Sequence, residues 1–485
     1  MKSVALHNLG CKVNAYEMDF MQQMLQEKGY KIVSFDEEAD IYIVNTCTVT
    51  NIADRKSRQM LHRAKKRNPD AVVVAVGCYV QTGQETLLKD GAVDLAIGNN
   101  RKKDLVEILE AYLKHRDKAE MPATQQKAGT EQSEAADGMC GAENASWREA
   151  MAAEPVQFKP VTDIIDIAHA PYEEMTLKTT AEHTRAYIKI QDGCNQFCSY
   201  CMIPYARGRV RSRLEENILR EARGLSETGY REVVLTGIHI SSYGVDRGGS
   251  ELVRLLEKLS EIEGIERIRL GSLEPGIVTE EFAAAISALP KVCPHFHLSL
   301  QSGSDTVLRR MNRRYDTAGY LSAVERLRKY YVNMAITTDV IVGFPGETEE
   351  EFAQTEEFLR RVGFYEMHIF KYSRRQGTRA AAMEGQLTEA EKAVRSDRLM
   401  KLEREMSRAY RETFLGKTEE VLFEELVERD GQAYWIGHTT RYLKAARKAD
   451  PGENLQNRIA AGKLRAFWED DVLLMESLME SLMEN

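Results

Sequence analysis

The chain has 485 residues, of which 43% are hydrophobic and 29% charged, and its formal net charge is −9. This composition is typical of a soluble globular protein, and the length predicts two to four domains rather than a single core. Eight cysteines are too few for a disulfide scaffold, and the acidic balance excludes a protein coated in positive charge, although a local basic track stays compatible with it.

Neither a membrane span nor a secretory signal is expected. The apolar run AVVVAV at residues 71–76 is far shorter than the ~20 residues of a membrane helix. The first residues, MKSVALHNLGCKVN, contain no apolar core long enough for a signal peptide. We therefore expect a cytoplasmic enzyme that does not contact a membrane.

Residues 1–117 alternate short β-branched runs with amphipathic runs. The predicted strands are Ser3–Leu9, Lys31–Ser34, Ile41–Thr46, Ala71–Gly77 and Asp94–Gly98. The predicted helices are Ala15–Lys28, Ala53–Arg67, Gln81–Lys89 and Lys102–Lys114. This alternation predicts an α/β domain, in which a parallel sheet carries helices on its faces.

Residues 118–181 are expected to form a flexible insertion or linker. Within them, Lys118–Glu154 is rich in Ala, Glu, Gln, Ser and Gly and has almost no aliphatic periodicity.

Two further domains follow. Residues 182–415 return to the strand–helix rhythm with RAYIKIQ, EVVLTGI, RIRLGSL, HFHLSLQ, AITTDVIVGF and EMHIFKYS, which predict six parallel strands in a partial β/α barrel. Residues 416–480 contain short strand-like pieces spaced by turns, as in a small antiparallel β-barrel. Eight Lys or Arg against three acids between positions 429 and 465 make this last domain locally basic.

Three cysteines lie in QDGCNQFCSYC directly after the run RAYIKIQ: Cys194, Cys198 and Cys201. A structural zinc site needs four protein ligands, and the motif offers no fourth Cys or His at ligand distance. A four-iron cluster held by three thiolates leaves one iron open for a substrate or cofactor. The spacing favours this cluster over an incomplete zinc site or three unrelated thiols.

Three more cysteines, Cys11, Cys47 and Cys78, each follow a predicted strand of the first domain. The carboxyl ends of parallel strands meet at one edge of a sheet, so these thiols are expected to converge although they are far apart in sequence. The pattern predicts a second three-thiolate cluster; the alternative is a chance set of small core residues.

Two histidines, His295 and His297, alternate on one predicted strand and therefore face the same side. A pair of core histidines is favoured over a metal site here.

At QDGCNQFCSYCMIPYARGR the sequence resembles the radical S-adenosylmethionine enzymes, whose C-x3-C-x2-C loop follows the first barrel strand. The order of a three-cysteine domain, a radical barrel and a C-terminal TRAM domain resembles the methylthiotransferases. The stretch NTCTVTNIADRKSRQ around Cys47 looks like the branch that acts on threonylcarbamoyladenosine in tRNA. The isopentenyladenosine branch and the branch that modifies a ribosomal protein carry different residues after this cysteine.

The resemblance implies two 4Fe–4S clusters and S-adenosylmethionine as cofactors. Cys194, Cys198 and Cys201 would hold the cluster that cleaves S-adenosylmethionine to a 5′-deoxyadenosyl radical, which abstracts hydrogen from carbon-2 of the modified adenine. Cys11, Cys47 and Cys78 would be catalytic as well as metal ligands, because their cluster would deliver the methylthio group. The implied partners are the anticodon stem-loop of tRNA and a one-electron donor such as flavodoxin or ferredoxin, and the chain is expected to be a monomer.

Several strand-end residues are predicted to bind S-adenosylmethionine, although helix caps and strand-end turns use the same residue types. They are Thr236, Gly237, Ser272, Glu274, Gln301 and Asp339.

RNA contacts are expected in the basic C-terminal domain. The candidate phosphate contacts are Arg441, Lys444, Arg447 and Lys448, and the candidate stacking residues are Tyr434 and Tyr442, whereas Trp435 is expected in the core. Two other basic runs, residues 55–67 and the alternating Arg207, Arg209, Arg211 and Arg213, fit either a phosphate backbone or a solvated surface.

The sequence therefore predicts a transferase that methylthiolates N6-threonylcarbamoyladenosine in tRNA. Methylthiolation of isopentenyladenosine or of a ribosomal protein aspartate is the alternative within the family. A non-catalytic iron–sulfur regulator that binds RNA is the alternative from another class.

Overall fold

The computed structural model describes residues 2–87, 89–120, 161–180 and 184–477. The chain forms two compact units. The N-terminal unit comprises Met1–Met175 together with Met202–Arg209, and the C-terminal unit comprises Thr176–Cys201 together with Val210–Asn485. None of the helices in the described ranges combines the length and the hydrophobicity that crossing a bilayer requires.

The N-terminal unit is built on a parallel sheet with the strand order β2-β1-β3-β4-β5-β6. Its strands are β1 (Ser3–Asn8), β2 (Lys31–Val33), β3 (Ile41–Thr46), β4 (Val72–Gly77), β5 (Leu95–Ile97) and β6 (Val161–Asp163). Every residue of β3 and β4 is buried, as expected for central strands covered on both faces. The predicted α/β class and the five predicted strands are confirmed.

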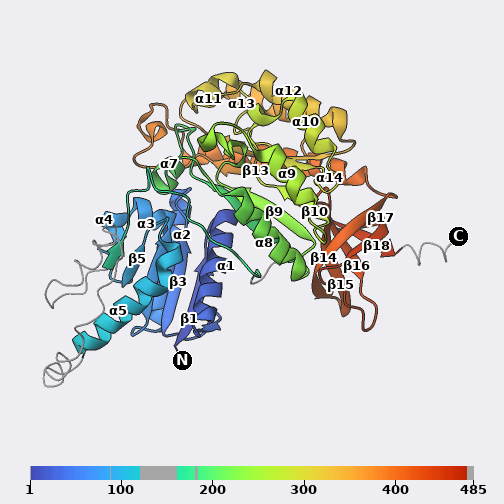
Figure 1. Cartoon of the computed structure of the whole chain (residues 1–485). Helices are drawn as coiled ribbons and strands as arrows, with labels where there is room; N and C mark the ends of the chain where they lie inside the picture. The colour runs from blue at the N-terminus through green and yellow to red at the C-terminus, as the bar shows by residue number, and fades with distance from the viewer. Residues whose placement is uncertain (1, 88, 121–160, 181–183, 478–485) are drawn as a thin grey trace. The chain divides into compact units, whose positions relative to one another are not determined.

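Helices cover both faces of this sheet (Figure 1). They are α1 (Lys12–Glu27), α2 (Asn51–Arg67), α3 (Cys78–Thr82), α4 (Gln84–Leu87), the 3₁₀ turn η1 (Lys102–Asp104), α5 (Leu105–Glu120) and α7 (Ile203–Arg207). One face packs against α1 and α5, and the other packs against α2, α3 and α4.

The edge strand β6 lies inside the stretch that the sequence assigns to the insertion of residues 118–181. It pairs with β5, and its buried Asp163 accepts hydrogen bonds from Arg101 at 2.8 and 3.0 Å. A three-residue strand is too short to show a periodic pattern, which is why the sequence did not reveal it. The low-complexity part of the predicted insertion, residues 121–160, lies outside the described residues.

The C-terminal unit contains six mutually parallel strands in two sheets, ordered β7-β9-β10 and β11-β12-β13, which isolated bridges join. They are β7 (Ala186–Asp192), β9 (Glu232–Gly237), β10 (Arg267–Leu270), β11 (His295–His297), β12 (Ala335–Val342) and β13 (Glu366–Lys371). Isolated parallel bridges, such as Leu273–Leu298, join β10 to the β11 side, and the short antiparallel β8 (Arg211–Ser212) pairs with β7. The predicted partial β/α barrel is confirmed.

The outer face of these strands is apolar and packs against the helices of this unit (Figure 1). The α-helices are α8 (Glu215–Glu227), α9 (Leu252–Ser260), α10 (Glu280–Ser287), α11 (Asp305–Arg310), α12 (Thr317–Tyr330), α13 (Glu349–Val362) and α14 (Glu389–Glu412). The 3₁₀ turns are η3 (Ile240–Ser242), η4 (Val245–Arg247), η5 (Pro275–Ile277) and η6 (Arg379–Ala382). Because side chains alternate along a strand, the residues between the apolar ones face the inside of the open barrel.

The last strands of the C-terminal unit close into a separate small barrel with the order β14-β15-β16-β18-β17. They are β14 (Thr418–Arg429), β15 (Gln432–Thr439), β16 (Lys444–Lys448), β17 (Ile459–Glu469) and β18 (Val472–Ser477). All neighbouring pairs are antiparallel except β16–β18. The predicted small β-barrel is confirmed.

Candidate functional site

The loop after β7 carries Cys194, Cys198 and Cys201, and all three thiols are partly accessible. Gly193, with a φ of 71°, allows the chain to turn sharply where the strand ends. The main chain of Ser199 ties the loop to the fold, since its N–H donates to Met311 at 3.0 Å and its carbonyl accepts from Ala380 at 2.7 Å. The loop is therefore held in place at the carboxyl end of the barrel strand.

Two donors point at the sulfur atoms of this loop. Arg313 Nη1 lies 3.2 Å from Cys198 Sγ, and the backbone N–H of Gln196 lies 3.4 Å from Cys194 Sγ. Burial raises the pKa of Cys194 to about 11, so its thiol must lose a proton before it binds a metal. Hydrogen bonds to sulfur of this kind stabilise the thiolates of iron–sulfur clusters.

A carboxylate sits beside the cysteine loop. Glu274 accepts hydrogen bonds from Gln196 Nε2 at 2.7 Å and pairs with His239 Nε2 at 3.0 Å. Burial alone would raise the pKa of Glu274, but the hydrogen bond and charge of His239 outweigh it and hold this pKa below its ordinary value. Glu274 is therefore an anionic acceptor next to the loop. Sequence reasoning named Glu274 but missed His239, which follows the predicted Gly237 by two residues.

The other residues predicted to bind S-adenosylmethionine are spread along neighbouring strand ends. Thr236 is buried in β9, and a Cβ at Gly237 would lie 3.0 Å from the Gln191 carbonyl, so no side chain fits there without movement. Ser272 is exposed. Gln301 is buried with a φ of 73°, and its N–H donates to the Asp339 carbonyl at 2.9 Å.

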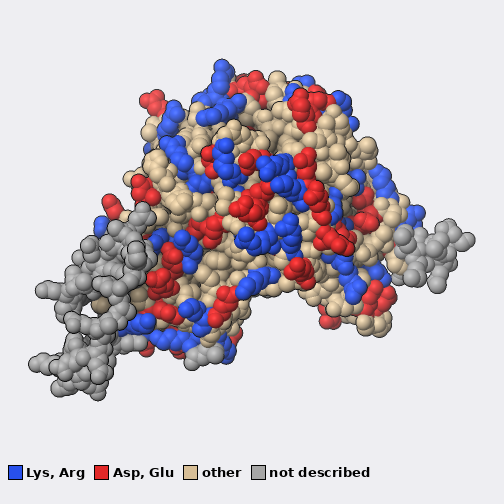
Figure 2. Space-filling view, in the orientation of Figure 1, with Lys and Arg blue, Asp and Glu red and all other residues tan. Residues whose placement is uncertain are grey.

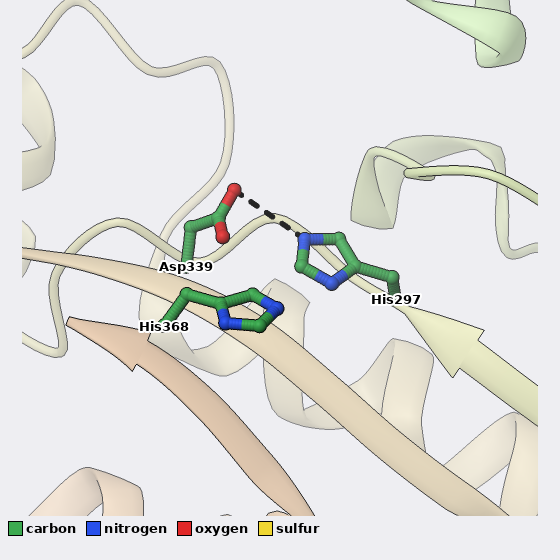
Figure 3. Close-up of side chains that lie close together, drawn as sticks. All are labelled: His297, Asp339 and His368. Atoms are coloured by element: carbon green, nitrogen blue, oxygen red, sulfur yellow. Dashed lines mark ion pairs between the residues drawn. The ribbon is translucent and has the colours of Figure 1, made fainter. Parts of the chain in front are cut away.

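Asp339 lies in a polar group on three adjacent strands (Figure 3). His297 from β11, Asp339 from β12 and His368 from β13 bring one candidate ligand atom each to within 4.8 Å of one another. The expectation of a histidine pair in the core holds for His295, which is buried and stacks on Tyr442 at 5.1 Å, but His297 belongs to this polar group.

In the N-terminal unit, Cys11, Cys47 and Cys78 follow β1, β3 and β4, three strands that are adjacent in the sheet. Burial is the main cause of the raised pKa of Cys47, and the neighbouring Cys78 and Cys11 thiols raise it further. Cys11 is solvent-accessible, whereas Cys47 and Cys78 are buried. The predicted convergence at one sheet edge is what the strand order produces.

The turn before Cys11 is tightly packed against Cys47. Gly10 has a φ of 111°, and a Cβ on it would lie 3.1 Å from Cys47 Sγ. Burial raises the pKa of Cys47 to about 12, while the charge of Arg207 acts in the opposite direction. A cation at this edge would have to displace protons from these thiols.

Arg207 on α7 connects the thiol edge to a buried charge network. Its Nε lies 3.2 Å from Cys78 Sγ, and its Nη atoms donate to Glu17 at 2.8 and 3.0 Å and to Asn14 Oδ1 at 2.7 Å. Lys102 forms a second ion pair with Glu17, and the side chains of all three charged residues are almost completely buried. The local sequence pattern contains no sign of this network.

Both thiol sets fit a polynuclear cluster better than a single ion. Among the described residues, neither set brings its three sulfur atoms within 4.8 Å of one another, the spacing at which one ion would be held. Each set offers three thiols and a side-chain or backbone donor aimed at a sulfur atom. The donor chemistry matches that of cysteine-ligated iron–sulfur clusters.

Two of the four residues predicted to bind RNA form ion pairs within the small barrel. Arg441 pairs with Glu419 at 3.1 Å, and Arg447 pairs with Asp450 and Glu453 at 3.1 and 3.3 Å. The remaining candidates are accessible lysines: Lys444 is half-buried and Lys448 is exposed.

Of the two tyrosines predicted to stack on bases, one is enclosed by other side chains and one is partly accessible. Tyr442 is enclosed by His295 and His438, whereas the half-buried Tyr434 packs on Trp468 at a ring distance of 4.8 Å. Trp435 is buried in the barrel core, as expected.

The alternating arginines after the cysteine loop do not form a phosphate-binding stripe. Arg207 and Arg213 are fully buried and pair with Glu17 and Glu221, and Arg211 is buried beside Asp192. That prediction is wrong because the stretch folds into a short helix and a two-residue strand rather than one edge strand.

Helix α2 keeps part of its basic run at the surface. Arg63 and Arg67 pair with Asp36, and Lys65 pairs with Asp94, whereas Arg55, Lys56 and Lys66 are exposed. On the face that Figure 2 shows, basic and acidic side chains alternate among the coloured residues rather than gathering by sign.

Comparison with known proteins identifies two matching families. The Radical SAM superfamily matches residues 188–359, and the uncharacterized protein family UPF0004 matches residues 3–98.

Curated relatives match over nearly the whole chain. The chain is 37% identical to the threonylcarbamoyladenosine tRNA methylthiotransferase MtaB of Bacillus subtilis, over 92% of this chain and 91% of the relative. It is 34% identical to the tRNA-2-methylthio-N(6)-dimethylallyladenosine synthase of Methylacidiphilum infernorum, over 96% and 94% of the two chains.

A solved structure has a similar fold. The radical S-adenosylmethionine methyltransferase TsrM from Kitasatospora setae, with cobalamin and a 4Fe–4S cluster bound, aligns with a TM-score of 0.52 at 16% identity. The alignment covers 78% of this chain and 77% of TsrM.

Proposed function

Because the chain belongs to the family of radical S-adenosylmethionine tRNA methylthiotransferases, we propose that it transfers a methylthio group to carbon-2 of N6-threonylcarbamoyladenosine next to the anticodon of tRNA. The predicted family and transferase activity are confirmed by identity that extends over nine-tenths of both chains. The relatives that share the proposed substrate include MtaB of Bacillus subtilis, at 37% identity.

The observation that carries the proposal is the presence of two three-thiol sites, each at the carboxyl edge of a parallel sheet. The cofactors of this family are 4Fe–4S clusters and S-adenosylmethionine, which together supply one-electron cleavage to a 5′-deoxyadenosyl radical. One cluster would be held by Cys194, Cys198 and Cys201, and the other by Cys11, Cys47 and Cys78. Two three-thiol sites suit two tasks, radical generation and sulfur delivery.

The protein itself supplies orientation around these sites. Arg313 and the Gln196 N–H would stabilise the thiolates of the loop. Glu274, which stays ionised, would accept a hydrogen bond from the amino group or ribose of S-adenosylmethionine. Gly237 is needed for close packing at the end of β9, because a Cβ there would lie 3.0 Å from both the Gln191 carbonyl and the Ile240 side chain.

The small barrel is proposed to be a TRAM-like module that binds the anticodon stem-loop. Lys444 and Lys448 would contact phosphates, and the half-buried Tyr434 would stack on an exposed base. We further propose that a flavodoxin or ferredoxin supplies the electron and that the protein acts as a monomer in the cytoplasm.

Mass spectrometry of tRNA nucleosides tests the substrate. A strain that lacks the gene should lose 2-methylthio-N6-threonylcarbamoyladenosine and keep its unthiolated precursor, and the intact gene should restore the product. Unchanged methylthio-adenosines would exclude a tRNA substrate. Loss of only the methylthiolated dimethylallyl derivative would show that dimethylallyladenosine is the substrate.

Anaerobic reconstitution tests whether the chain is a catalyst at all. With dithionite, S-adenosylmethionine and substrate tRNA, the protein should release 5′-deoxyadenosine. A protein that binds both clusters and RNA but never releases 5′-deoxyadenosine would be a regulator and not an enzyme.

A further inference from the structure

Three polar side chains meet on the neighbouring strands β11, β12 and β13 (Figure 3). His297 Nε2 lies 3.4 Å from Asp339 Oδ2, and the rings of His297 and His368 stack with centroids 6.0 Å apart. His368 is exposed, whereas the side chain of Asp339 is 31% exposed and that of His297 only 13%. The group therefore runs from a buried end to an open end.

The group faces the inside of the open barrel. On each strand, the neighbouring residues Phe296, Val340 and Met367 belong to the core that packs against the outer helices. Side chains alternate between the two faces of a sheet, so the polar group points away from that core. Enzymes with β/α barrels build their sites at the carboxyl ends of the strands, and His297 is the last residue of β11.

His297 is held in place and has unused hydrogen-bonding capacity. Its Nδ1 contacts Thr337 Oγ1 at 3.1 Å, which fixes the ring orientation. Its Nε2 is buried and has no hydrogen-bond partner among the described residues. Its contact with Asp339 Oδ2 at 3.4 Å is an ion pair and not a hydrogen bond, so a ligand that hydrogen-bonds to Nε2 would add a contact that the protein does not make.

We propose that His297, Asp339 and His368 form the subsite that recognises the threonylcarbamoyl group of the substrate. This inference rests on the proposed function. The group carries a carboxylate, a hydroxyl and ureido N–H groups, so it needs both donors and an acceptor. The imidazole N–H groups would donate to the carboxylate of the threonylcarbamoyl group. The Asp339 carboxylate would accept from its hydroxyl or from a ureido N–H.

The position in the fold agrees with this role. The backbone carbonyl of Asp339 accepts from the N–H of Gln301, a residue at the strand end proposed to meet S-adenosylmethionine. In adenine, carbon-2 and the carbon that bears N6 both adjoin N1. A site that attacks carbon-2 must therefore also enclose the N6 substituent.

The subsite also explains discrimination by chemistry. A dimethylallyl group is apolar and would cover the His297–Asp339 pair without offering either residue a hydrogen bond. Sites built to hydrogen-bond a substrate reject analogues that lack the bonding groups far more strongly than apolar pockets reject an added group. We expect the polar group to favour threonylcarbamoyladenosine.

The test replaces the exposed member, His368→Leu, in the reconstituted full chain. The substrates are one tRNA that carries N6-threonylcarbamoyladenosine and the same tRNA with plain adenosine at that position. The variant should lose about 10-fold or more in kcat/KM on the first tRNA, mainly through KM, and should change little on the second. His115→Leu, an exposed histidine on α5, is the matched control and should match the wild type.

The outcomes separate this inference from the proposed function. If the wild type does not thiolate the threonylcarbamoyl substrate, the proposed function fails. If the wild type thiolates this substrate and His368→Leu prefers it over the unmodified tRNA by the same factor in kcat/KM, the subsite is refuted. Metal analysis of cluster-reconstituted protein adds a second check: a stoichiometric non-iron metal that His368→Leu removes would make the group a cation site and overturn the proposal.

Discussion

Replacing Arg207 tests the buried network of the N-terminal unit. The guanidinium is fully buried and supplies donors to Glu17, Asn14 and Cys78. Methionine has a similar length but no donor. Arg207→Met therefore leaves Glu17 with Lys102 as its remaining ion-pair partner and removes the donor nearest the Cys78 sulfur.

The expected magnitude follows from the burial of the pair. Removing one partner of a buried ion pair costs about 3–5 kcal/mol when the other charge loses its compensation, and we expect the lower limit here because Lys102 still pairs with Glu17. At ~1.4 kcal/mol per factor of ten, the lower limit corresponds to a loss of about 100-fold in protection from local opening. Arg207→Lys keeps the charge but not the forked geometry, so its protection should lie between that of the wild type and that of Arg207→Met.

Hydrogen–deuterium exchange measures this effect locally. Peptides that cover residues 12–27 and 202–209 should lose protection in Arg207→Met, and peptides from the small barrel should not change. Arg209→Met, at an exposed arginine two residues on, is the control. Equal protection in both variants would refute the view that this network stabilises the thiol edge.

Three other changes have defined outcomes. Cys47→Ala should abolish methylthio transfer while 5′-deoxyadenosine release continues, with the loss of one cluster seen by iron analysis; retention of both clusters would contradict its assigned role. Gly208→Ala should lower the melting temperature, because Gly208 has a φ of 71° and a Cβ would lie 2.1 Å from the Ile167 carbonyl oxygen; an unchanged melting temperature would argue against this packing. The third change concerns the carboxylate of Glu351. Burial alone would raise the pKa of Glu351, but hydrogen bonds led by Arg310 hold this pKa at about 2, below its ordinary 4.5. The ionised carboxylate should therefore stabilise the fold fully above about pH 4.5, and this stabilisation should disappear toward pH 2. Solvent screening limits this stabilisation to about 1–2 kcal/mol. The free energies of unfolding of the wild type and of Glu351→Gln, measured over that pH range, should differ less as the pH falls.

Much of the fold follows from local pattern in the sequence. The predicted strand Ile41–Thr46 has the observed bounds, because a central parallel strand is a continuous apolar run with sharp ends. The position of Cys11, Cys47 and Cys78 after three adjacent strands was predictable too, since it needs only the rule that parallel strands end at one edge. Both predictions rest on properties that neighbouring residues carry.

Arg207 shows where local pattern fails. Its spacing from Arg209, Arg211 and Arg213 predicts an extended strand, yet its partner Glu17 lies 190 residues away in the chain. A residue at such a distance leaves no trace in the surrounding sequence, so burial of the charge could not be anticipated. The same holds for Arg441, which lies in the turn after β15, whereas its partner Glu419 lies on β14.

The two thiol sites differ in what a sequence change would do to them. Cys194, Cys198 and Cys201 share one loop, so their spacing is set by a few backbone angles, including the positive φ values of Gly193 and Phe197. The other set depends on the register of three strands, since a shift by one residue would turn a thiol to the opposite face of the sheet. One-residue insertions in β3 or β4 should therefore remove the second cluster and spare the first, whereas an insertion between Cys194 and Cys198 should do the reverse. Cluster counts by iron analysis and EPR in such variants would reveal whether each set of thiols holds its own cluster, and an insertion in β4 that left both clusters intact would contradict the dependence on strand register.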